Sequence, residues 1–189
     1  MRRRPSRPTP RSLTRLLTLV VAVLLTPSLA AAQTGEALIR KAGAFTPIPN
    51  PGFAADKSQE LKVVWDITEA PATAGEMPPG LSRPANFFML AEAEGVPRAR
   101  VHLALLVHGG ATPSLMSNAH YRAAKGVDNP SIPLLQAMAD AGVQIIVCGQ
   151  SIVRQKIARE QLLPFVKVST SATIARAVLH AQGYTTMVP

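Results

Sequence analysis

The residue with the clearest chemical potential is Cys148, the only cysteine of the 189-residue chain. It closes the apolar run QIIVC, and after it come Gly149 and a stretch, SIVRQKIA, with the composition of a helix. Gly149 allows the backbone to turn and another molecule to approach closely, and Ser151 is a typical helix cap. A thiol beside a helix N-terminus, with Arg154 near it, is shifted toward the nucleophilic thiolate. The pattern predicts a reactive thiol, but a free cysteine that ends a buried strand is also often plain apolar filling, so both interpretations stand.

A second candidate is His108, which ends another apolar run, LALLVH, before two glycines. Open α/β sheets bind ligands at the carboxyl ends of their strands, so His108 and Cys148 are candidates for one site. The other histidines (His102, His120 and His180) show no H-x-x-x-H or Cys/His spacing and no carboxylate cluster, and we expect no metal site. The chain also contains no G-x-G-x-x-G, P-loop or G-x-S-x-G motif, so we expect no bound cofactor.

Alternating strands and helices would place both residues at such an edge. Apolar and β-branched runs predict five strands, at residues 61–68, 99–110, 143–148, 165–170 and 184–188. Helical periodicity predicts helices at 84–95, 129–142 and 171–183, with Pro84 and Asn129 starting the first two and Ile174, Val178 and Ala181 aligned on one face of the third. This order predicts an α/β fold, a three-layer sandwich with a five-stranded parallel sheet between helices.

The connection from residue 111 to residue 131 is long for a link between a strand and a helix. Such connections in compact domains are usually functional covers or disordered segments. Its part SNAHYRAAKG, residues 117–126, could form a short helix. The segment is therefore either a lid that shields the thiol or a solvated surface insertion.

The first 32 residues have the three parts of a secretory signal peptide: an arginine-rich start, a ten-residue apolar core from Leu16 to Leu25, and a small-residue site that ends at Ala32. The apolar core is half of the about 20 residues that span a bilayer, so we expect cleavage after Ala32 and no stable membrane anchor. The protein would then be exported, to the periplasm. Residues 33–60, with prolines at 47, 49 and 51, predict an extended arm or a loose tail before a domain at 61–189.

Removal of this segment changes the charge of the chain. Six of its 20 basic residues lie in the first 32, which leaves 14 basic and 11 acidic residues and a net charge of +3. The remaining basic residues are spread singly, whereas nucleic-acid binding needs a clustered basic face, so we expect no nucleic-acid partner. A single cysteine also excludes an internal disulfide, and a lone cysteine in an exported protein indicates a reactive thiol or an intermolecular pair.

The order and spacing of several short motifs resemble the DsrE/DsrF-like family, in its exported branch. These motifs are VHG-A after the second strand, DNP before the next helix and VCGQS after the third strand, followed by LLPFVKVSTSA and GYTTMVP. The resemblance covers about residues 60–189. It implies a small α/β subunit that assembles into a homo-oligomer, with its second and third strands side by side.

The resemblance also implies a chemistry. Family members that act in sulfur relay hold sulfur as a persulfide on a cysteine, and Cys148 occupies that position. The implied function is a sulfur carrier or sulfurtransferase-like subunit that works with sulfur donor and acceptor proteins. Cys148 would be the nucleophile and His108 its neighbour, and the amides of Gly149, Gln150 and Ser151 would stabilise the anion. The alternative is a non-enzymatic small-ligand-binding or assembly subunit in which Cys148 is buried and serves only in packing.

Overall fold

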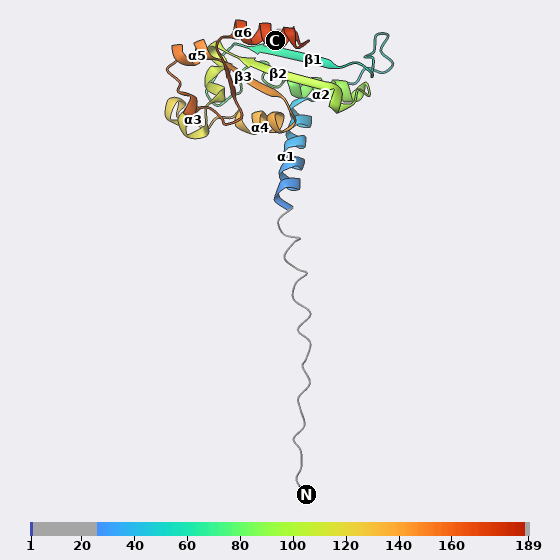
Figure 1. The fold of residues 1–189 in the computed structure, drawn as a ribbon, viewed down its shortest axis with the longest axis horizontal. Helices are drawn as coiled ribbons and strands as arrows, with labels where there is room; N and C mark the ends of the chain where they lie inside the picture. The colour runs from blue at the N-terminus through green and yellow to red at the C-terminus, as the bar shows by residue number, and fades with distance from the viewer. Residues whose placement is uncertain (2–25, 188–189) are drawn as a thin grey trace.

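The chain folds around a parallel β-sheet, which confirms the predicted α/β class. The computed structural model describes Met1 and residues 26–187. Five strands pair in the order β4-β3-β2-β1-β5, every pair parallel (Figure 1). The strands are β1 (Leu61–Ile67), β2 (Val101–Val107), β3 (Gln144–Cys148), β4 (Lys167–Ser169) and β5 (Thr185–Met187). β2 and β3 are therefore neighbours, as the resemblance implies.

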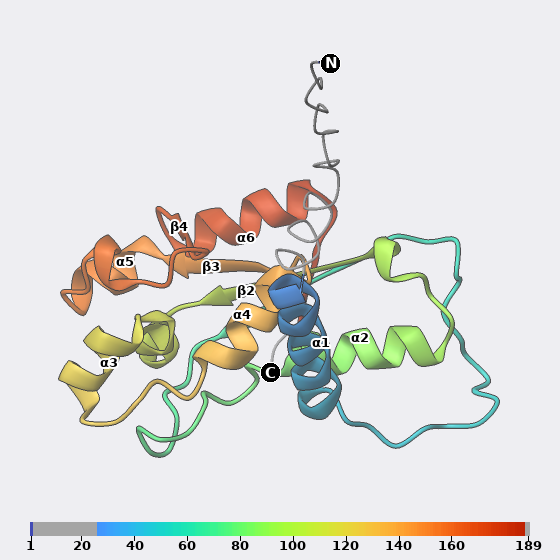
Figure 2. The same cartoon turned by 90° about the horizontal axis from the view of Figure 1, so that it is seen from below.

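Helices cover both faces of the sheet, but unequally (Figures 1 and 2). One face carries α1 (Thr26–Ala42), α2 (Arg83–Ala93) and α4 (Ile132–Asp140), and the other carries α6 (Ala172–Ala181). Two shorter helices, α3 (Asn118–Lys125) and α5 (Gly149–Arg154), lie toward the carboxyl ends of the strands. Short 3-10 helices are η1 (Arg98–Arg100), η2 (Gly109–Leu115) and η3 (Arg159–Gln161).

Alternate residues of each strand enter two separate cores, because successive side chains of a strand point to opposite faces. The larger core, on the side of α1, α2 and α4, takes Trp65 from β1, Leu105 from β2 and Val147 from β3. The smaller core takes Leu106 and Ile146 and is closed by Ala175 and Leu179 of α6. The strands are apolar on both faces for this reason, which explains their nearly continuous apolar sequence.

The predicted extended arm is wrong for its first part. Residues 33–42 belong to α1, whose Ile39 is fully buried in the larger core, and α1 contacts both α4 and α2 (Figure 2). Only residues 44–60 form the irregular chain that Pro47, Pro49 and Pro51 predict. The periodicity of the helical part was hidden because the prolines that follow dominate the composition of the segment.

Most of the predicted signal peptide lies outside the described residues. The backbone of α1 runs without a break across the expected cleavage position between Ala32 and Gln33. Among the residues that the structure describes, none forms a helix long and apolar enough to cross a membrane.

The second predicted helix begins later than expected, because the Asn129 side chain forms hydrogen bonds with the preceding segment and does not cap the helix. α4 starts at Ile132 with Ser131 as its N-cap. The buried Asn129 side chain donates from Nδ2 to the carbonyl oxygens of Ser114 and Met116, at 2.9 and 2.7 Å, and accepts from the Ser131 amide at 3.0 Å. Asn129 therefore holds the backbone at Ser114 and Met116 in place instead of capping the helix.

Candidate functional site

Cys148 is the last residue of β3 and lies at the carboxyl edge of the sheet, as the sequence predicts. It follows Ile146 by two positions, so its side chain faces the α6 side of the sheet, where Ile146 contributes to the smaller core. Cys148 is 6% exposed. The thiol is thus largely buried, but it lies at the rim of the sheet next to the first residues of two helices.

Those helices set the acidity of the thiol. Burial raises the pKa of Cys148, but hydrogen bonds from the Ser151 hydroxyl and from the backbone amides of Ser151, Ala172 and Gln150 outweigh it, so the pKa is lowered from its ordinary value. Gln150 and Ser151 belong to the first turn of α5, and Ala172 is the first residue of α6. Amide N–H groups in a first helical turn have no partner within the helix, so they are free to stabilise an anion.

The prediction that Ser151 caps α5 is wrong. The N-cap is Cys148 itself, and Ser151 lies inside the first turn, where its side chain is buried. Its Oγ accepts a hydrogen bond from the amide of Gly109 at 3.2 Å, which leaves the hydroxyl proton for the thiol. The Ser151 hydroxyl therefore acts as a hydrogen-bond donor to the sulfur. The amide of Gly109, in the segment after β2, holds this hydroxyl in place.

Gly149 is required by a close contact within the chain. A Cβ atom at this position would lie 2.6 Å from the carbonyl oxygen of Ser169 and 3.1 Å from that of Thr170. The end of β4 therefore passes directly over the start of α5. The close approach that the sequence suggested for another molecule is made by this backbone.

The two remaining predicted residues differ in their relation to the thiol. Gln150 contributes its amide to the sulfur, and its side chain reaches the carbonyl oxygen of Thr170 at 3.4 Å. Arg154 is the last residue of α5 and is exposed. Within the described residues it is not among the groups that act on the Cys148 pKa. Arg154 lies at the opposite end of a six-residue helix from the thiol, and its effect on the thiolate stays a prediction.

His108 lies beside Cys148 on the same face of the sheet. Val107 and Val147 are partners in the β2–β3 ladder, so the next residues, His108 and Cys148, occupy neighbouring positions at the carboxyl edge. His108 keeps extended backbone angles, and its amide donates to the carbonyl oxygen of Ile67 at 3.0 Å. Its side chain follows that of Leu106 on the α6 face.

The structure adds three residues that the sequence analysis missed. Asp66 of β1 and Arg176 of α6 form an ion pair on the same face, and Asp66 also lies 3.9 Å from Nε2 of His108. Ala172 supplies an amide to the thiol. The signal available for Asp66 was a carboxylate inside an otherwise apolar strand, VVWDI; nothing comparable marks Ala172, whose contribution is a backbone amide.

The 111–131 segment is not a lid over the thiol. It forms the rest of η2 and then α3, which confirms the predicted short helix. Its Ala111, Leu115, Met116 and Tyr121 side chains are buried in the larger core, on the opposite face of the sheet. The segment is a fixed part of that core, and the residue that bonds Ser151 at the thiol site, Gly109, precedes the segment.

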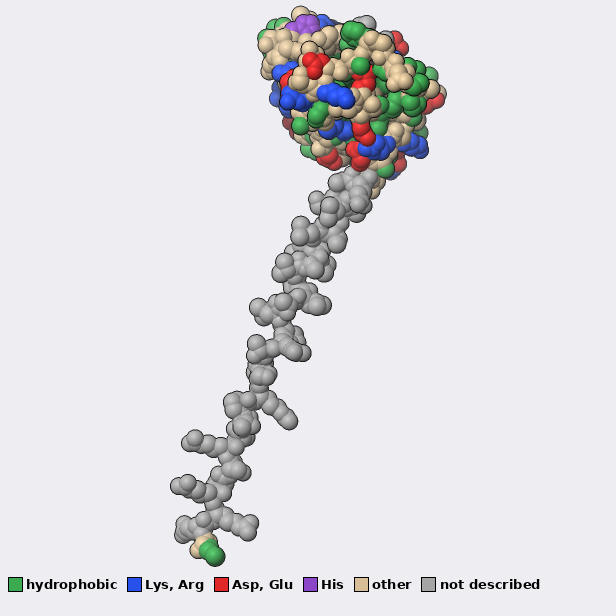
Figure 3. All heavy atoms as spheres, turned by 90° about the vertical axis from the view of Figure 1, so that its right-hand side faces the viewer, with side chains coloured by type: hydrophobic (Ala, Val, Ile, Leu, Met, Phe, Trp, Pro, Cys, Tyr) green, Lys and Arg blue, Asp and Glu red, His purple; other side chains and the backbone are tan. Residues whose placement is uncertain are grey.

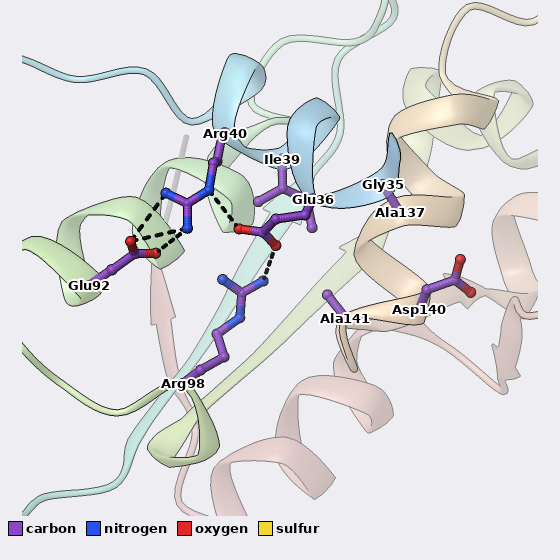
Figure 4. A pocket seen from close by; sticks show the side chains of 9 residues that line it. All are labelled: Gly35, Glu36, Ile39, Arg40, Glu92, Arg98, Ala137, Asp140 and Ala141. Carbon is purple, nitrogen blue, oxygen red and sulfur yellow. Dashed lines mark hydrogen bonds and ion pairs between the residues drawn. The ribbon is translucent and has the colours of Figure 1, made fainter. Parts of the chain in front are cut away.

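A hollow lies between α1, α2 and α4, away from these residues (Figure 4). Its volume is about 490 Å³. Its charged side chains mostly satisfy one another, since Arg40 pairs with Glu36 and Glu92 and Arg98 lies 3.8 Å from Glu36. It contains no nucleophile and lies away from the carboxyl edge, so we do not place the chemistry there.

The described residues form no clustered site for a metal ion, and the face shown in Figure 3 has none for nucleic acid. The described residues contain no group of three or more His, Cys, Asp and Glu side chains placed to hold a metal ion. Figure 3 shows Lys and Arg interspersed with Asp and Glu on the side that it displays, without a continuous basic patch of the kind that binds nucleic acid.

Loss of the Ser151 hydroxyl should raise the pKa of Cys148, because one of the donors that stabilise the thiolate disappears. The rate of alkylation by iodoacetamide, measured against pH, reports this pKa, since only the thiolate reacts. We expect wild type to reach its half-maximal rate at a lower pH than the denaturant-unfolded chain, and Ser151→Ala to move that midpoint upward. Thr112→Val is the matched control, because the Thr112 hydroxyl bonds the carbonyl oxygen of Gly109 at 2.8 Å and does not act on the thiol. Equal midpoints in wild type and Ser151→Ala would contradict this account.

One solved structure that resembles the chain is a protein of unknown function, MTH1491, from Methanobacterium thermoautotrophicum. It has 16% sequence identity and a TM-score of 0.49, and the similarity covers 68% of this chain and 99% of that one. No curated protein matches the chain.

The family itself is shown by a sequence model. The model of the DsrE/DsrF-like family matches residues 72–189, more than half of the chain. The match includes β2, β3 and α6, and with them His108, Cys148, Ala172 and Arg176. The chain therefore belongs to the DsrE/DsrF-like family, which is associated with sulfur relay.

Proposed function

We propose that the protein is a sulfur carrier, or sulfurtransferase-like subunit, that holds sulfur as a persulfide on Cys148. The observation that carries this proposal is the set of donors around the thiol: the Ser151 hydroxyl and the amides of Gln150, Ser151 and Ala172 lower its pKa although burial raises it. An inert cysteine at the end of a buried strand needs no such donors, whereas a nucleophile and a negatively charged persulfide both benefit from them.

The reaction has a simple balance. The Cys148 thiolate attacks the terminal sulfur of a donor persulfide, R–S–SH. A sulfur–sulfur bond to Cys148 forms as the donor's sulfur–sulfur bond breaks, and the donor leaves as the thiolate R–S⁻. This thiolate takes up the proton that Cys148 lost, so no oxidant or reductant is consumed.

Delivery requires a second protein or small thiol. Cys148 is the only cysteine in the chain, so the stored sulfur cannot be released by formation of an internal disulfide. An acceptor thiolate must attack the outer sulfur of the Cys148 persulfide. We therefore propose separate donor and acceptor partners. We place the process after export, in the periplasm, on the strength of the signal-peptide pattern in residues 1–32, and N-terminal sequencing of the exported protein tests that location.

One observation favours the alternative, in which the domain is a binding or assembly subunit and Cys148 is filling. Cys148 is 6% exposed, so little of its surface is open to a sulfur donor. The two functions differ in what they require of the thiol in the native protein: a carrier must react without unfolding, and a filler must resist reaction.

The deciding experiment is sulfur loading followed by intact-mass spectrometry. Native protein treated anaerobically with glutathione persulfide is expected to gain the mass of one sulfur atom, and the gain should vanish on treatment with a reducing thiol. Cys148→Ser should gain nothing while it retains the circular dichroism spectrum of wild type. A wild-type protein that stays unloaded, and whose thiol reacts with iodoacetamide only after denaturation, would leave the filling role in place.

We also propose that the subunit self-associates through the outer surface of α6. Ile174, Ala177, Val178 and Ala181 are exposed at the spacing i, i+3, i+4 and i+7, which places them in one stripe along the helix. Ile174 and Val178 are 52% and 50% exposed. Ile174, Val178 and Ala181 share one face of the predicted helix, and in the structure this face points away from the sheet. A second copy of α6 lying against this stripe would cover it on both subunits.

A further inference from the structure

Asp66 is a buried carboxylate at the same edge and on the same face of the sheet as His108 and Cys148. It is the second-last residue of β1 and is 9% exposed. Its Oδ2 atom accepts hydrogen bonds from Nε and Nη2 of Arg176, at 3.1 and 2.5 Å. A buried charge is retained only where it is paired, and Arg176 provides a partner for one of the two carboxylate oxygens.

The other oxygen of Asp66 faces His108. Asp66 Oδ1 and His108 Nε2 are 3.9 Å apart. Both atoms are shielded from solvent, and neither has a hydrogen-bond partner among the described residues. Buried polar atoms without partners are costly and rare in native proteins, and a catalytic role is one of the reasons for which they are retained. A movement of about 1 Å would join these two atoms in a hydrogen bond.

We propose that Asp66 is the positioning residue for His108 during sulfur exchange at Cys148, an inference that rests on the proposed function. Asp66 Oδ1 accepts the proton of His108 Nε2, and this bond fixes the imidazole in its Nε2–H form, since the partner of one ring nitrogen decides the role of the other. Nδ1 is then the nitrogen that takes the proton of the Cys148 thiol. The same proton passes to the thiolate of the departing donor, which returns the imidazole to its neutral form.

The neighbouring elements support each part of this arrangement. The β2–β3 register places His108 next to Cys148, and the β1–β2 register pairs Asp66 with Leu106, two residues before His108. Arg176 comes from α6, whose first residue, Ala172, gives its amide to the thiol. Three strands and one helix thus bring a carboxylate, an imidazole and a thiol to one edge, with the arginine holding the carboxylate.

The substitution Asp66→Asn tests this role through the state of the imidazole. Arg176 offers only donors, so it should keep the amide oxygen of the new side chain, and the NH₂ group should then face His108 Nε2. A donor in that place bonds only to an unprotonated Nε2, so His108 is expected to switch to its Nδ1–H form. Nitrogen-15 NMR of the histidine rings distinguishes the two forms, and the His108 signals are identified by their loss in His108→Gln.

The same variant should load sulfur from glutathione persulfide about 10²-fold more slowly than wild type, the size expected for one proton-transfer group. The final extent of loading should be unchanged, because Cys148 is intact. Asp140→Asn is the matched control, since Asp140 is an exposed carboxylate on α4. This control should change neither the histidine spectrum nor the loading rate.

The outcomes separate this inference from the proposed function. Wild type that loads sulfur but holds His108 in the Nδ1–H form would overturn the role of Asp66 and leave the carrier function standing. This measurement is made on wild type, and His108→Gln serves only to identify the signals. Unchanged ring form and unchanged rate in Asp66→Asn would overturn it as well. Wild type that does not load sulfur would refute the carrier function, whereas the NMR spectra would still show whether Asp66 fixes His108.

Discussion

Alanine in place of Gly149 is expected to lower the free energy of unfolding by about 1–3 kcal/mol, the usual cost of forcing an extra carbon into a filled space. The added Cβ would lie 2.6 Å from the carbonyl oxygen of Ser169 and 3.1 Å from that of Thr170. Both are backbone atoms, which yield less easily than the end of a flexible side chain. Relief requires the end of β4 to move away from α5. Urea unfolding of wild type and variant measures the difference.

The same movement should reach the thiol. Ala172 follows the displaced segment by two residues, and its amide is one of the donors that lower the Cys148 pKa. We expect Gly149→Ala to raise the pH at which alkylation is half-maximal. Gly52→Ala is the control, because no atom lies within 4 Å of the Cβ position there. Equal losses of stability in the two variants would show that the close contact at Gly149 is not important.

The fold could be predicted from the sequence because its strands are apolar on both faces and its helices begin and end at clear signals. VHLALLV and QIIVC have the composition of buried parallel strands, and the alternation of strand and helix leaves few topologies. The first helix could not be found in the same way. α1 packs across α4 and α2, and its sequence overlaps the end of the segment with signal-peptide features and precedes a proline-rich stretch.

The candidate site was predicted where it depends on strand ends and missed where it depends on contacts between distant segments. His108 and Cys148 each close an apolar run, so the edge that they share follows from parallel pairing. Asp66 and Arg176 are 110 positions apart, and no local pattern connects them. Arg154 is near Cys148 in sequence, but the six residues of α5 separate the two in space, which sequence distance does not show.

Glutamate at both Ile174 and Val178 is expected to convert the proposed oligomer into monomers. In a two-fold contact between α6 helices the double substitution removes four apolar side chains. Each is half exposed in the single subunit, so its burial contributes roughly 1 kcal/mol. A loss of about 4 kcal/mol corresponds to a dissociation constant about 10³-fold higher, before any repulsion between the new charges. Light scattering coupled to size-exclusion chromatography, over a range of protein concentrations, measures the change.

The fold of the subunit should survive this change, because glutamate is a better helix former than isoleucine or valine and neither residue contributes to a core. The control adds the same two charges elsewhere, with Leu90→Glu on α2 and Val127→Glu after α3, where the side chains are 42% and 41% exposed. This control variant should show the same oligomer molar mass as the wild type. A wild type that is monomeric at high micromolar concentration would refute the α6 contact. An oligomer that withstands both glutamates would place the interface on another surface, because two charges cannot be buried in an apolar contact without partners.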